Sequence, residues 1–354
     1  DLGAKLTAEQ RSLRNLHLYF AYENYEGARL DSWSARHGHE TTCLDGPNAD
    51  VLEGYGNLIS QLATGLDIRS SRRVVAVDYP VAEGQKTSDR NAEPALVVCT
   101  AMATDDGTEE VYIAPKCVIT LPLGVLRSGA VLFRPPMPSH KAQPLHRLGV
   151  ALMDKVEILW AKRWWPTNVG SLTISSLESN PVYHPWPWFL EPRAARRHPL
   201  GMGVLVCFVT GRFAEEVESL DDQKVVDGCI EALRKAFPKK SVPDPIEAHT
   251  TRWGRDPYAL GSWTYYAKDS GPADASALAE SIGSNGCVAF AGEHTCDGSQ
   301  HGLDMGTVHG AWLSGVLAAR RVSGAVACDI EAGLGCPGFR DIQMGSSSEG
   351  SSSD

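Results

Sequence analysis

A predicted strand, a Gly-Glu pair and a predicted helix follow one another near the C-terminal end of the chain. The apolar run 288–291 predicts a buried strand that ends at Gly292 and Glu293. A loop rich in Gly, Asp and His follows, and then Gly306 and Thr307 open an apolar helix. The free N–H groups at a helix start stabilise negative charge, and glycines let a ligand approach the backbone. This pattern is typical of a cofactor site, although a strand-turn-helix whose glycines serve only packing has the same pattern.

Lys155 is the residue whose chemistry is most unusual for its position. It lies inside the apolar run MDKVEILW, where burial disfavours the charged form of a lysine unless the ammonium group is paired or hydrated. Alternatively, Lys155 points outward and pairs with Glu157, which lies on the same face of the strand.

Aromatic residues are concentrated in the segment TRWGRDPYALGSWTYY. Trp263 and Tyr265 share one face of a predicted strand, and Trp253 lies ten residues before Trp263. An aromatic surface accommodates a cation on approach and a neutral amine afterwards. The usual meaning of such a run is an aromatic strand in the core.

The elements that position these residues alternate between strands and helices. A helix is expected over residues 7–25, where Thr7 and Gln10 form a capping box. Apolar runs predict strands in RRVVAVDY, ALVVCTAMA, EEVYIAPKCVIT, GVALMDKVEILW and GVLVCFVTG. Ser219 is expected to cap a helix that ends near Pro238. The polar, low-complexity tail 341–354 is expected to be disordered.

The composition limits the classes of function. The chain has 354 residues, 43% of them hydrophobic, which allows two domains or one large domain with a substantial core. A net charge of −10 argues against a general nucleic-acid binder. The nine cysteines contain no Cys-x-x-Cys pair, so neither a metal site nor redox chemistry is predicted, and a reducing compartment is expected. No apolar run approaches the length of a membrane span, and no signal peptide is evident.

Five segments, taken in order, resemble the flavin-containing amine oxidases. They are EGYGNLISQLA, VITLPLGVL, MDKVEILW, TRWGRDPYALGSWTYY and FAGEHT with GTVHGAWLSG, and they span roughly residues 10 to 322. The GEHT and TVHGA-x-LSG wording is most similar to the lysine-specific histone demethylase branch of that family, with the polyamine oxidases next.

The resemblance implies a non-covalent FAD cofactor, because Ser262 stands where monoamine oxidases carry the cysteine that bonds the flavin. It implies that Glu293, with Gly292, binds the ribose and pyrophosphate region, and that Thr307 and Val308 lie against the flavin ring. The remaining FAD contacts that it implies are Trp253, Val74, Thr120 and Pro122.

The resemblance also implies roles near the reacting atoms. Lys155 matches the family lysine that holds a water molecule against the flavin N5 atom. Trp263 matches the position of an aromatic cage over the substrate amine, with Tyr265 beside it. No second cage aromatic is present in 296–305, and His301 is the expected substitute.

One part of the family pattern is missing. The family opens its Rossmann-like domain with a strand and G-x-G-x-x-G, whose amides meet the pyrophosphate. Here the only match is 333–338, where no strand precedes and Pro337 removes a donor, so a loop is expected. The first nucleotide-binding unit is therefore expected upstream of Asp1 or on another chain.

The expected fold class is α/β, with two interleaved regions. A partial Rossmann-like FAD-binding domain is expected from 45–135 and 280–322. An α+β substrate domain built on a mixed sheet is expected from 1–44 and 136–279.

The implied activity is oxidation of an amine by hydride transfer to flavin N5, with release of an aldehyde and hydrogen peroxide. The first hypothesis is a histone-demethylase-like enzyme that acts on methylated lysine; a polyamine oxidase is the alternative, and a flavin-less scaffold that keeps the fold is a third. The implied partners are a histone tail peptide or a polyamine, molecular oxygen and chromatin corepressors, without membrane or direct nucleic-acid binding. The expected location is intracellular: the nucleus for a demethylase, otherwise the cytoplasm or a peroxisome.

Overall fold

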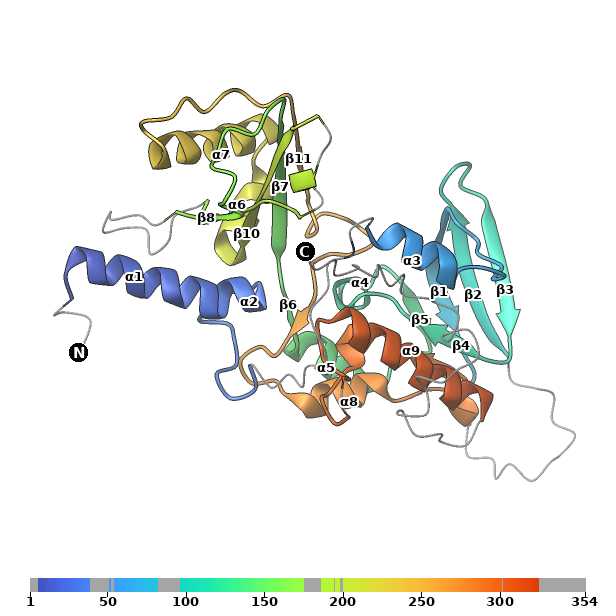
Figure 1. Cartoon of the computed structure of the whole chain (residues 1–354). Coiled ribbons are helices and arrows are strands. Elements are labelled where there is room, and N and C mark those ends of the chain that lie inside the picture. The colour runs from blue at the N-terminus through green and yellow to red at the C-terminus, as the bar shows by residue number, and fades with distance from the viewer. Residues whose placement is uncertain are drawn as a thin grey trace, which may run out of the picture.

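The computed structural model is a mixed α/β structure with several sheets, which confirms the expected fold class at that level (Figure 1). It describes residues 6–38, 51, 54–81, 96–174, 186–193, 195–197, 200–300 and 302–324. Three of the sequence predictions, those for His301, the loop 333–338 and the tail 341–354, lie outside these residues.

The N-terminal helix begins as the sequence predicts. The Thr7 hydroxyl accepts the Gln10 N–H, and the Gln10 side chain accepts the Thr7 N–H, so the capping box is confirmed. Helix α1 (Ala8–Leu18) continues through a π-helical turn (Tyr19–Glu23) into α2 (Asn24–Glu26). It ends at Gly27, whose φ of +62° is a left-handed conformation that favours glycine.

Lys155 lies on β7, the second strand of a five-stranded sheet with the order β11-β7-β10-β9-β8. Its strands are β7 (Met153–Trp160), β8 (Ser171–Thr173), β9 (Trp188–Leu190), β10 (Gly203–Thr210) and β11 (Glu247–Thr250). Every pairing in it is antiparallel, so the expectation of a mixed sheet was wrong. A parallel pair of strands would need a long crossover connection. In this sheet each strand instead runs opposite to its neighbours.

Two helices flank this sheet and complete its core. Helix α6 (Gly211–Ser219) follows β10 directly, and α7 (Asp222–Ala236) contributes Val225, Cys229 and Leu233 to a core with β7 and β10. The prediction that Ser219 caps the second helix was wrong. Ser219 ends α6, and the Asp221 carboxylate accepts the Lys224 N–H at 2.9 Å to cap α7. Asp is at least as good a cap as Ser, and it stands nearer the apolar stripe.

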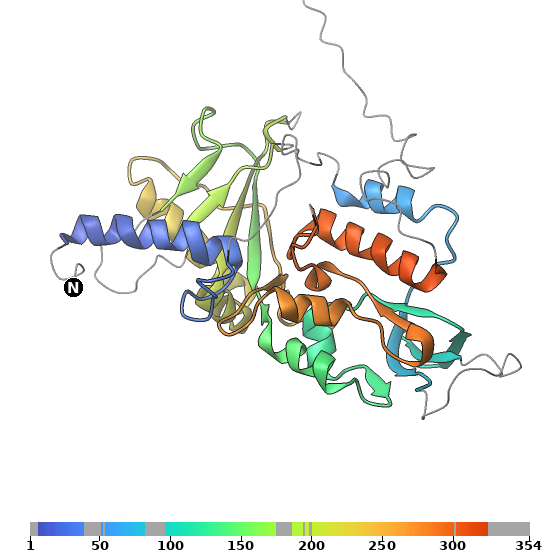
Figure 2. The same ribbon diagram turned by 90° about the horizontal axis from the view of Figure 1, so that it is seen from below.

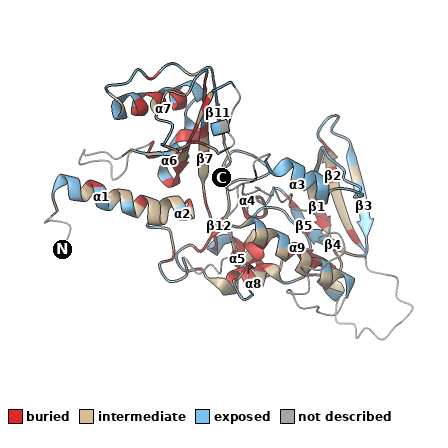
Figure 3. Ribbon diagram, viewed as in Figure 1, coloured by how far each residue is buried: buried red, intermediate tan, exposed pale blue. Residues whose placement is uncertain are grey.

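A second layer contains the strands that the resemblance assigns to FAD binding. A four-stranded sheet has the order β3-β2-β1-β5, with β1 (Arg72–Asp78), β2 (Val97–Ala103), β3 (Glu109–Ala114) and β5 (Leu132–Arg134). Beside it, β4 (Cys117–Ile119) and β13 (Val288–Phe290) form a parallel pair. Helix α4 (Leu123–Ser128) follows β4, and α3 (Tyr55–Leu62) lies at the exposed outer side of this layer (Figure 3).

Three further helices pack on these strands. Helices α5 (Ser139–Arg147) and α8 (Pro272–Ala279) lie against one another, and α9 (Val308–Ser323) packs on β13 and β4. Single helical turns occur at Ala195–Arg197, Ser284–Gly286 and Glu293–Thr295. Leu145 of α5 and Leu278 of α8 share one core with Val77 and Val288. The division of the chain into two domains with the expected boundaries stays a prediction.

A short two-stranded ladder joins the two layers. Strand β6 (Gly149–Val150) runs into β7, and it pairs antiparallel with β12 (Thr264–Tyr265). Figure 2 shows this junction between the five-stranded sheet with its N-terminal helix on one side and α9 on the other. No helix within the described ranges is long and apolar enough to cross a membrane.

Candidate active site

A pocket of about 290 Å³ lies where the layers meet, at the start of α9. Four stretches of chain surround it: the end of α2, the turn at 37–38, the β12 segment, and the loop before α9. Its lining residues are Tyr25, Glu26, His37, Gly38, Trp263, Thr264, Tyr265, Tyr266, Gly298, Asp304, Met305, Gly306 and Thr307. The structure therefore brings Trp263 and Tyr265 together with Thr307, as the resemblance implies.

Trp263 is held between two glycines. The Trp263 carbonyl accepts the Ala151 N–H at 2.7 Å, which ties the residue to the start of β7. A Cβ atom on Gly27 would lie 2.7 Å from the Trp263 ring, and one on Gly306 would lie 3.1 Å from it. Both glycines have positive φ, so the backbone conformation and the indole each require the absence of a side chain.

Tyr265 presents its ring to the pocket and uses its hydroxyl elsewhere. The hydroxyl donates to the Ser32 Oγ at 3.1 Å, and the ring packs over Gly149, where a Cβ atom would lie 2.2 Å from it. A buried tyrosine normally has a partner for its hydroxyl. Tyr265 therefore contributes an apolar aromatic face to the pocket.

Glu293 connects the aromatic strand to the start of α9. Its carboxylate accepts the Gly306 N–H at 2.8 Å and the Thr264 hydroxyl at 2.7 Å. Burial raises the pKa of Glu293, while these donors and the Thr264 N–H oppose that rise. Glu293 thus positions the two residues that lie next to Trp263 and Thr307; its contact with FAD stays a prediction.

Thr307, which lines the pocket, caps the first turn of α9. The Thr307 hydroxyl accepts the Gly310 N–H at 3.0 Å and donates to the Asp304 carbonyl at 2.7 Å. Val308 is 59% exposed, and within the described contacts the N–H groups of Val308 and His309 have no acceptor. Helix N–H groups that lack acceptors attract negative charge.

Sequence reasoning missed two carboxylates of the pocket, Glu26 and Asp304. Asp304 is buried, and its Oδ2 lies 3.2 Å from His309 Nε2. Glu26 stands at the end of α2. Neither carries a local signal, because a single acidic residue in a helix or a polar loop is most often solvated.

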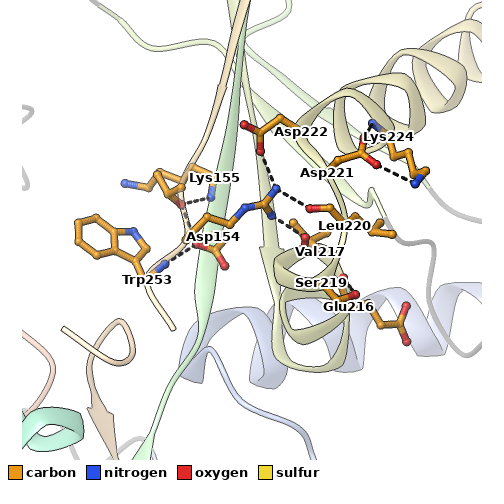
Figure 4. A network of polar contacts seen from close by, with 12 residues as sticks. Asp154, Lys155, Glu216, Val217, Ser219, Leu220, Asp221, Asp222, Lys224 and Trp253 are labelled. Carbon is orange, nitrogen blue, oxygen red and sulfur yellow. Dashed lines mark hydrogen bonds and ion pairs between the residues drawn. The ribbon is translucent and has the colours of Figure 1, made fainter. Parts of the chain in front are cut away.

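Lys155 lies outside the lining of this pocket, near the start of β7. It is half-buried, and its Nζ lies 5.8 Å from the centre of the Phe208 ring. Glu157, its alternative partner, instead lies 3.6 Å from His249. Figure 4 shows the Lys155 and Trp253 side chains on the same side of β7. The role of Lys155 beside a flavin stays a prediction.

The segment that carries Trp253 is pinned to β7 by buried carboxylates, which sequence reasoning also missed. Asp154 Oδ1 accepts the Trp253 N–H at 3.1 Å and the Thr251 hydroxyl at 2.8 Å (Figure 4). Burial raises the pKa of Asp154 to about 6, and the neighbouring Glu218 carboxylate adds to the rise. Glu218 accepts the Gly254 N–H at 2.6 Å. The Trp253 side chain itself is 40% exposed.

Arg252 completes this attachment from the other side. Its guanidinium donates to the Val217 and Leu220 carbonyls and to Asp222 Oδ1, the last at 2.6 Å (Figure 4). A planar guanidinium with several donors suits such a multiple contact. The segment 251–254 is therefore fixed on α6 and β7 by three charged side chains.

The remaining predicted FAD residues stand on the other layer. Thr120 and Pro122 are exposed and follow β4, and Gly292 follows β13 with a φ of +133°. Because these two strands are parallel, their carboxyl ends meet at one edge, which is where ligands bind in open α/β sheets. Val74 lies on β1, next to an irregularity in its pairing with β2.

Ser262 holds the start of β7, and the non-covalent attachment of FAD stays a prediction. Its hydroxyl accepts the Met153 N–H at 2.9 Å and donates to the Met153 carbonyl. The residue has no thiol, and its oxygen is already used to hold the start of β7.

These residues fit FAD by the chemistry of their donors. Three features lie around one junction. They are the helix start at Val308, the positive-φ residues Gly292 and Gly306, and the carboxyl ends of the parallel strands β4 and β13. Among the described residues, no group of three His, Cys, Asp or Glu side chains is placed to hold a metal ion.

The comparisons with known proteins identify the family. The sequence profile described as flavin containing amine oxidoreductase matches residues 2–323. The chain belongs to the flavin-containing amine oxidoreductases. This is the family that the five sequence segments resemble, so that resemblance is confirmed.

Similar proteins within the family have two kinds of name. The chain is 33% identical to polyamine oxidase 4 of Oryza sativa subsp. japonica over 82% of its length, and 29% identical to histone demethylase-like protein A of Aspergillus fumigatus over 91%. It is 30% identical to lysine-specific histone demethylase 2 of Homo sapiens over 86%. The chain spans 54% of the first protein, 29% of the second and 35% of the third.

One solved structure supports the fold alone. A double mutant of putrescine oxidase, redesigned in its cofactor binding, superimposes with a TM-score of 0.53 at 15% sequence identity. The superposition covers 74% of this chain and 51% of that chain. The amine oxidase fold is therefore shared.

Proposed function

We propose that this protein takes part in the FAD-dependent oxidation of an alkylated amine. The observation that carries the proposal is the pocket in which Trp263 and Tyr265 lie beside Gly306 and Thr307 at the open start of α9. An amine held against these aromatic rings would lie next to the N–H groups that favour a reduced, negatively charged flavin.

The residues that would hold FAD come from the layer that contains β4, β13 and α9. Val308 and Thr307 offer the helix start, and Gly292, Glu293 and Thr120 stand near the carboxyl ends of β13 and β4. When bound, FAD supplies the acceptor for a hydride from the carbon beside the amine nitrogen and passes the electrons to molecular oxygen. The side chains of the protein itself would bind and orient the amine.

The chain would orient the amine and control its charge. Glu26 and Asp304 attract a cationic amine to the pocket, and the rings of Trp263 and Tyr265 then accept it with little water around it. Lys155, next to the Trp253 segment, would hold a water molecule near the reacting atoms. No general base is required if the amine enters in its neutral form.

The substrate that we place first is a methylated lysine of a histone tail. The support is the pair of sequence motifs GEHT and TVHGA-x-LSG, together with the similarity to proteins named as histone demethylases. Chromatin corepressors and a nuclear location would follow from this substrate.

A polyamine is the second candidate, and one specific observation favours it. The pocket is compact and carries two carboxylates, which suits a short, multiply charged amine better than a long peptide. The similarity to polyamine oxidase 4 supports it as well, and a cytoplasmic or peroxisomal location would then be expected.

The decisive experiment measures hydrogen peroxide release by the FAD-loaded protein with a methylated histone peptide and, separately, with spermine. Release with the peptide alone supports the first candidate, and release with spermine alone supports the second. A colourless protein that cannot be loaded with FAD and releases no peroxide overturns both and favours a scaffold that keeps the fold without the flavin.

A further inference from the structure

Two thiols that no part of the amine chemistry uses face one another between the sheets of the FAD-side layer. Cys99 lies on β2 of the four-stranded sheet, and Cys117 opens β4 of the parallel pair. Their Sγ atoms are 3.7 Å apart, and either can be the hydrogen-bond donor. A disulfide needs the sulfurs at about 2.05 Å, so these two sulfurs would have to approach each other by about 1.7 Å to form one.

Both thiols are partly accessible. Cys99 and Cys117 are half-buried, so a small oxidant can reach them. The chain provides a contrast in Cys207 and Cys229, which lie side by side in the core under the five-stranded sheet and are both 0% exposed. Cys99 and Cys117 are therefore accessible to a reagent, whereas the buried Cys207 and Cys229 are not.

The electrostatics of the contact favour a reactive thiolate. The hydrogen bond with Cys117 lowers the pKa of Cys99 to about 7, and the same bond together with burial raises the pKa of Cys117. A substantial share of Cys99 is then ionised at neutral pH, and the thiolate is the nucleophilic form of cysteine. Cys117 is the neighbouring group that can resolve an oxidised Cys99.

We propose that Cys99 and Cys117 form a redox-active pair that a hydroperoxide oxidises to a disulfide. The Cys99 thiolate attacks one peroxide oxygen, the O–O bond breaks, and a sulfenic acid and hydroxide form. The Cys117 sulfur then attacks Cys99 Sγ, the S–O bond breaks, and the S–S bond forms with release of water. In total, two thiols lose two electrons and two protons, and one hydrogen peroxide becomes two water molecules.

The bond would have a structural consequence at the cofactor side. It would close the β2-β3-β4 segment into a ring and fix the start of β4 against β2. Thr120 and Pro122 follow β4 directly, so the pair acts on the strand that leads to the predicted FAD contacts. An oxidant that the family's own chemistry releases is hydrogen peroxide, but the proposal does not depend on that source.

The test uses the full chain, purified with reduced thiols and without any amine substrate. Hydrogen peroxide is added, the remaining thiols are alkylated, and peptides are mapped without reduction. We expect a linked pair of peptides that contain Cys99 and Cys117, lighter by about 2 Da than the two thiol peptides together, and reversed by dithiothreitol. Cys207 and Cys229 should react with the alkylating reagent only after denaturation, as internal controls.

Two variants make the test independent of folding defects. In Cys117→Ser, Cys99 should stop at the sulfenic acid and be trapped by dimedone, whereas in Cys99→Ser the trapping at Cys117 should be at least 10-fold weaker. Recovery of Cys99 and Cys117 as free thiols after peroxide treatment overturns the proposal, as does linkage of Cys207 to Cys229 instead. Because the peptide map needs neither flavin turnover nor an amine, a failure of the proposed amine oxidation leaves this result unaffected.

Discussion

The carboxylate of Glu293 accepts the Gly306 N–H at 2.8 Å and so joins the end of β13 to the turn that opens α9. The same carboxylate accepts the Thr264 hydroxyl, directly after Trp263. One acidic side chain therefore sets the distance between the aromatic wall of the pocket and the helix start.

The first prediction concerns this carboxylate. Glu293→Gln places an amide N–H₂ against donors that need an acceptor, so we expect a loss of about 1–3 kcal/mol in the free energy of unfolding. FAD retention should fall as well, because the helix start loses its anchor. Urea unfolding and flavin absorbance after gel filtration measure the two effects. Thr264→Ser keeps the hydroxyl and is the matched control; equal flavin content in all three proteins would contradict the prediction.

The second prediction separates binding from chemistry at Lys155. Lys155→Ala should retain flavin binding while the rate of flavin reduction by the amine falls about 100-fold or more, because the proposed water is no longer held. Stopped-flow absorbance of the FAD-loaded protein follows this step. Lys162→Ala, an exposed lysine just beyond β7, should change nothing. Unchanged turnover in Lys155→Ala would remove the role assigned to this residue.

The third prediction uses two glycines with the same backbone conformation. Gly27 and Gly65 have φ of +62° and +79°, but only at Gly27 does an added Cβ meet Trp263, at 2.7 Å, whereas nothing lies within 4 Å of one on Gly65. Alanine at either position should cost about 1 kcal/mol of stability through backbone strain. Only Gly27→Ala should also displace the indole and raise the amine KM several-fold. Equal KM values for the two variants would show that Trp263 does not contact the amine.

The fourth prediction concerns stability in acid. Burial, with the nearby Lys141 ammonium, lowers the pKa of His294 to about 4 from its ordinary value of 6.5. Between these values the unfolded chain binds more protons, so this residue's contribution to stability is complete above pH 6.5 and is lost as the pH falls to about 4. That contribution is on the order of 3 kcal/mol.

Its test is the pH dependence of the free energy of unfolding. His294→Gln should flatten the curve between pH 6.5 and 4, and His146→Gln, at an exposed site on α5, should leave it as it is. Identical slopes in all three proteins would show that His294 titrates normally in the folded state.

The fifth prediction concerns Asp154 as a positioning residue. Asp154→Asn keeps an oxygen for the Trp253 N–H and the Thr251 hydroxyl, whereas Asp154→Ala leaves both donors unpaired, at about 1–3 kcal/mol of stability. Because the folded pKa of about 6 lies above 3.8, the wild-type contribution of this group falls as the pH rises through 6. Asp154→Asn should remove that fall. Equal melting temperatures for the Asn and Ala variants would argue against the hydrogen bonds.

Much of the fold could be predicted from local patterns. The capping box at Thr7 and the strands around Lys155 and Cys207 were predicted correctly, because hydrogen bonds within a turn and apolar runs are visible in the sequence. The cap of α7 was misplaced since two acceptable caps, Ser219 and Asp221, stand two residues apart. The direction of strand pairing in the five-stranded sheet depends on contacts across the chain, which no local pattern contains.

The candidate site divides in the same way. Motifs mark Trp263, Tyr265 and Thr307 in the sequence, and the structure places all three in the lining of one pocket; their roles stay predictions. Asp154, Glu218 and Asp304 were missed, since each gains its importance from neighbours far away in the sequence. The Cys99 and Cys117 contact was missed for the same reason: 18 positions separate residues that the sheets bring together.

The link from Trp263 through Thr264 and Glu293 to Gly306 has a thermodynamic consequence. A ligand that presses on the indole also presses, through one carboxylate, on the turn that orients the dipole of α9. The midpoint potential of a bound flavin should therefore shift when the aromatic pocket is filled, even by an amine that cannot react. Binding of the amine and the electron affinity of the flavin would then depend on the same hydrogen-bonded link.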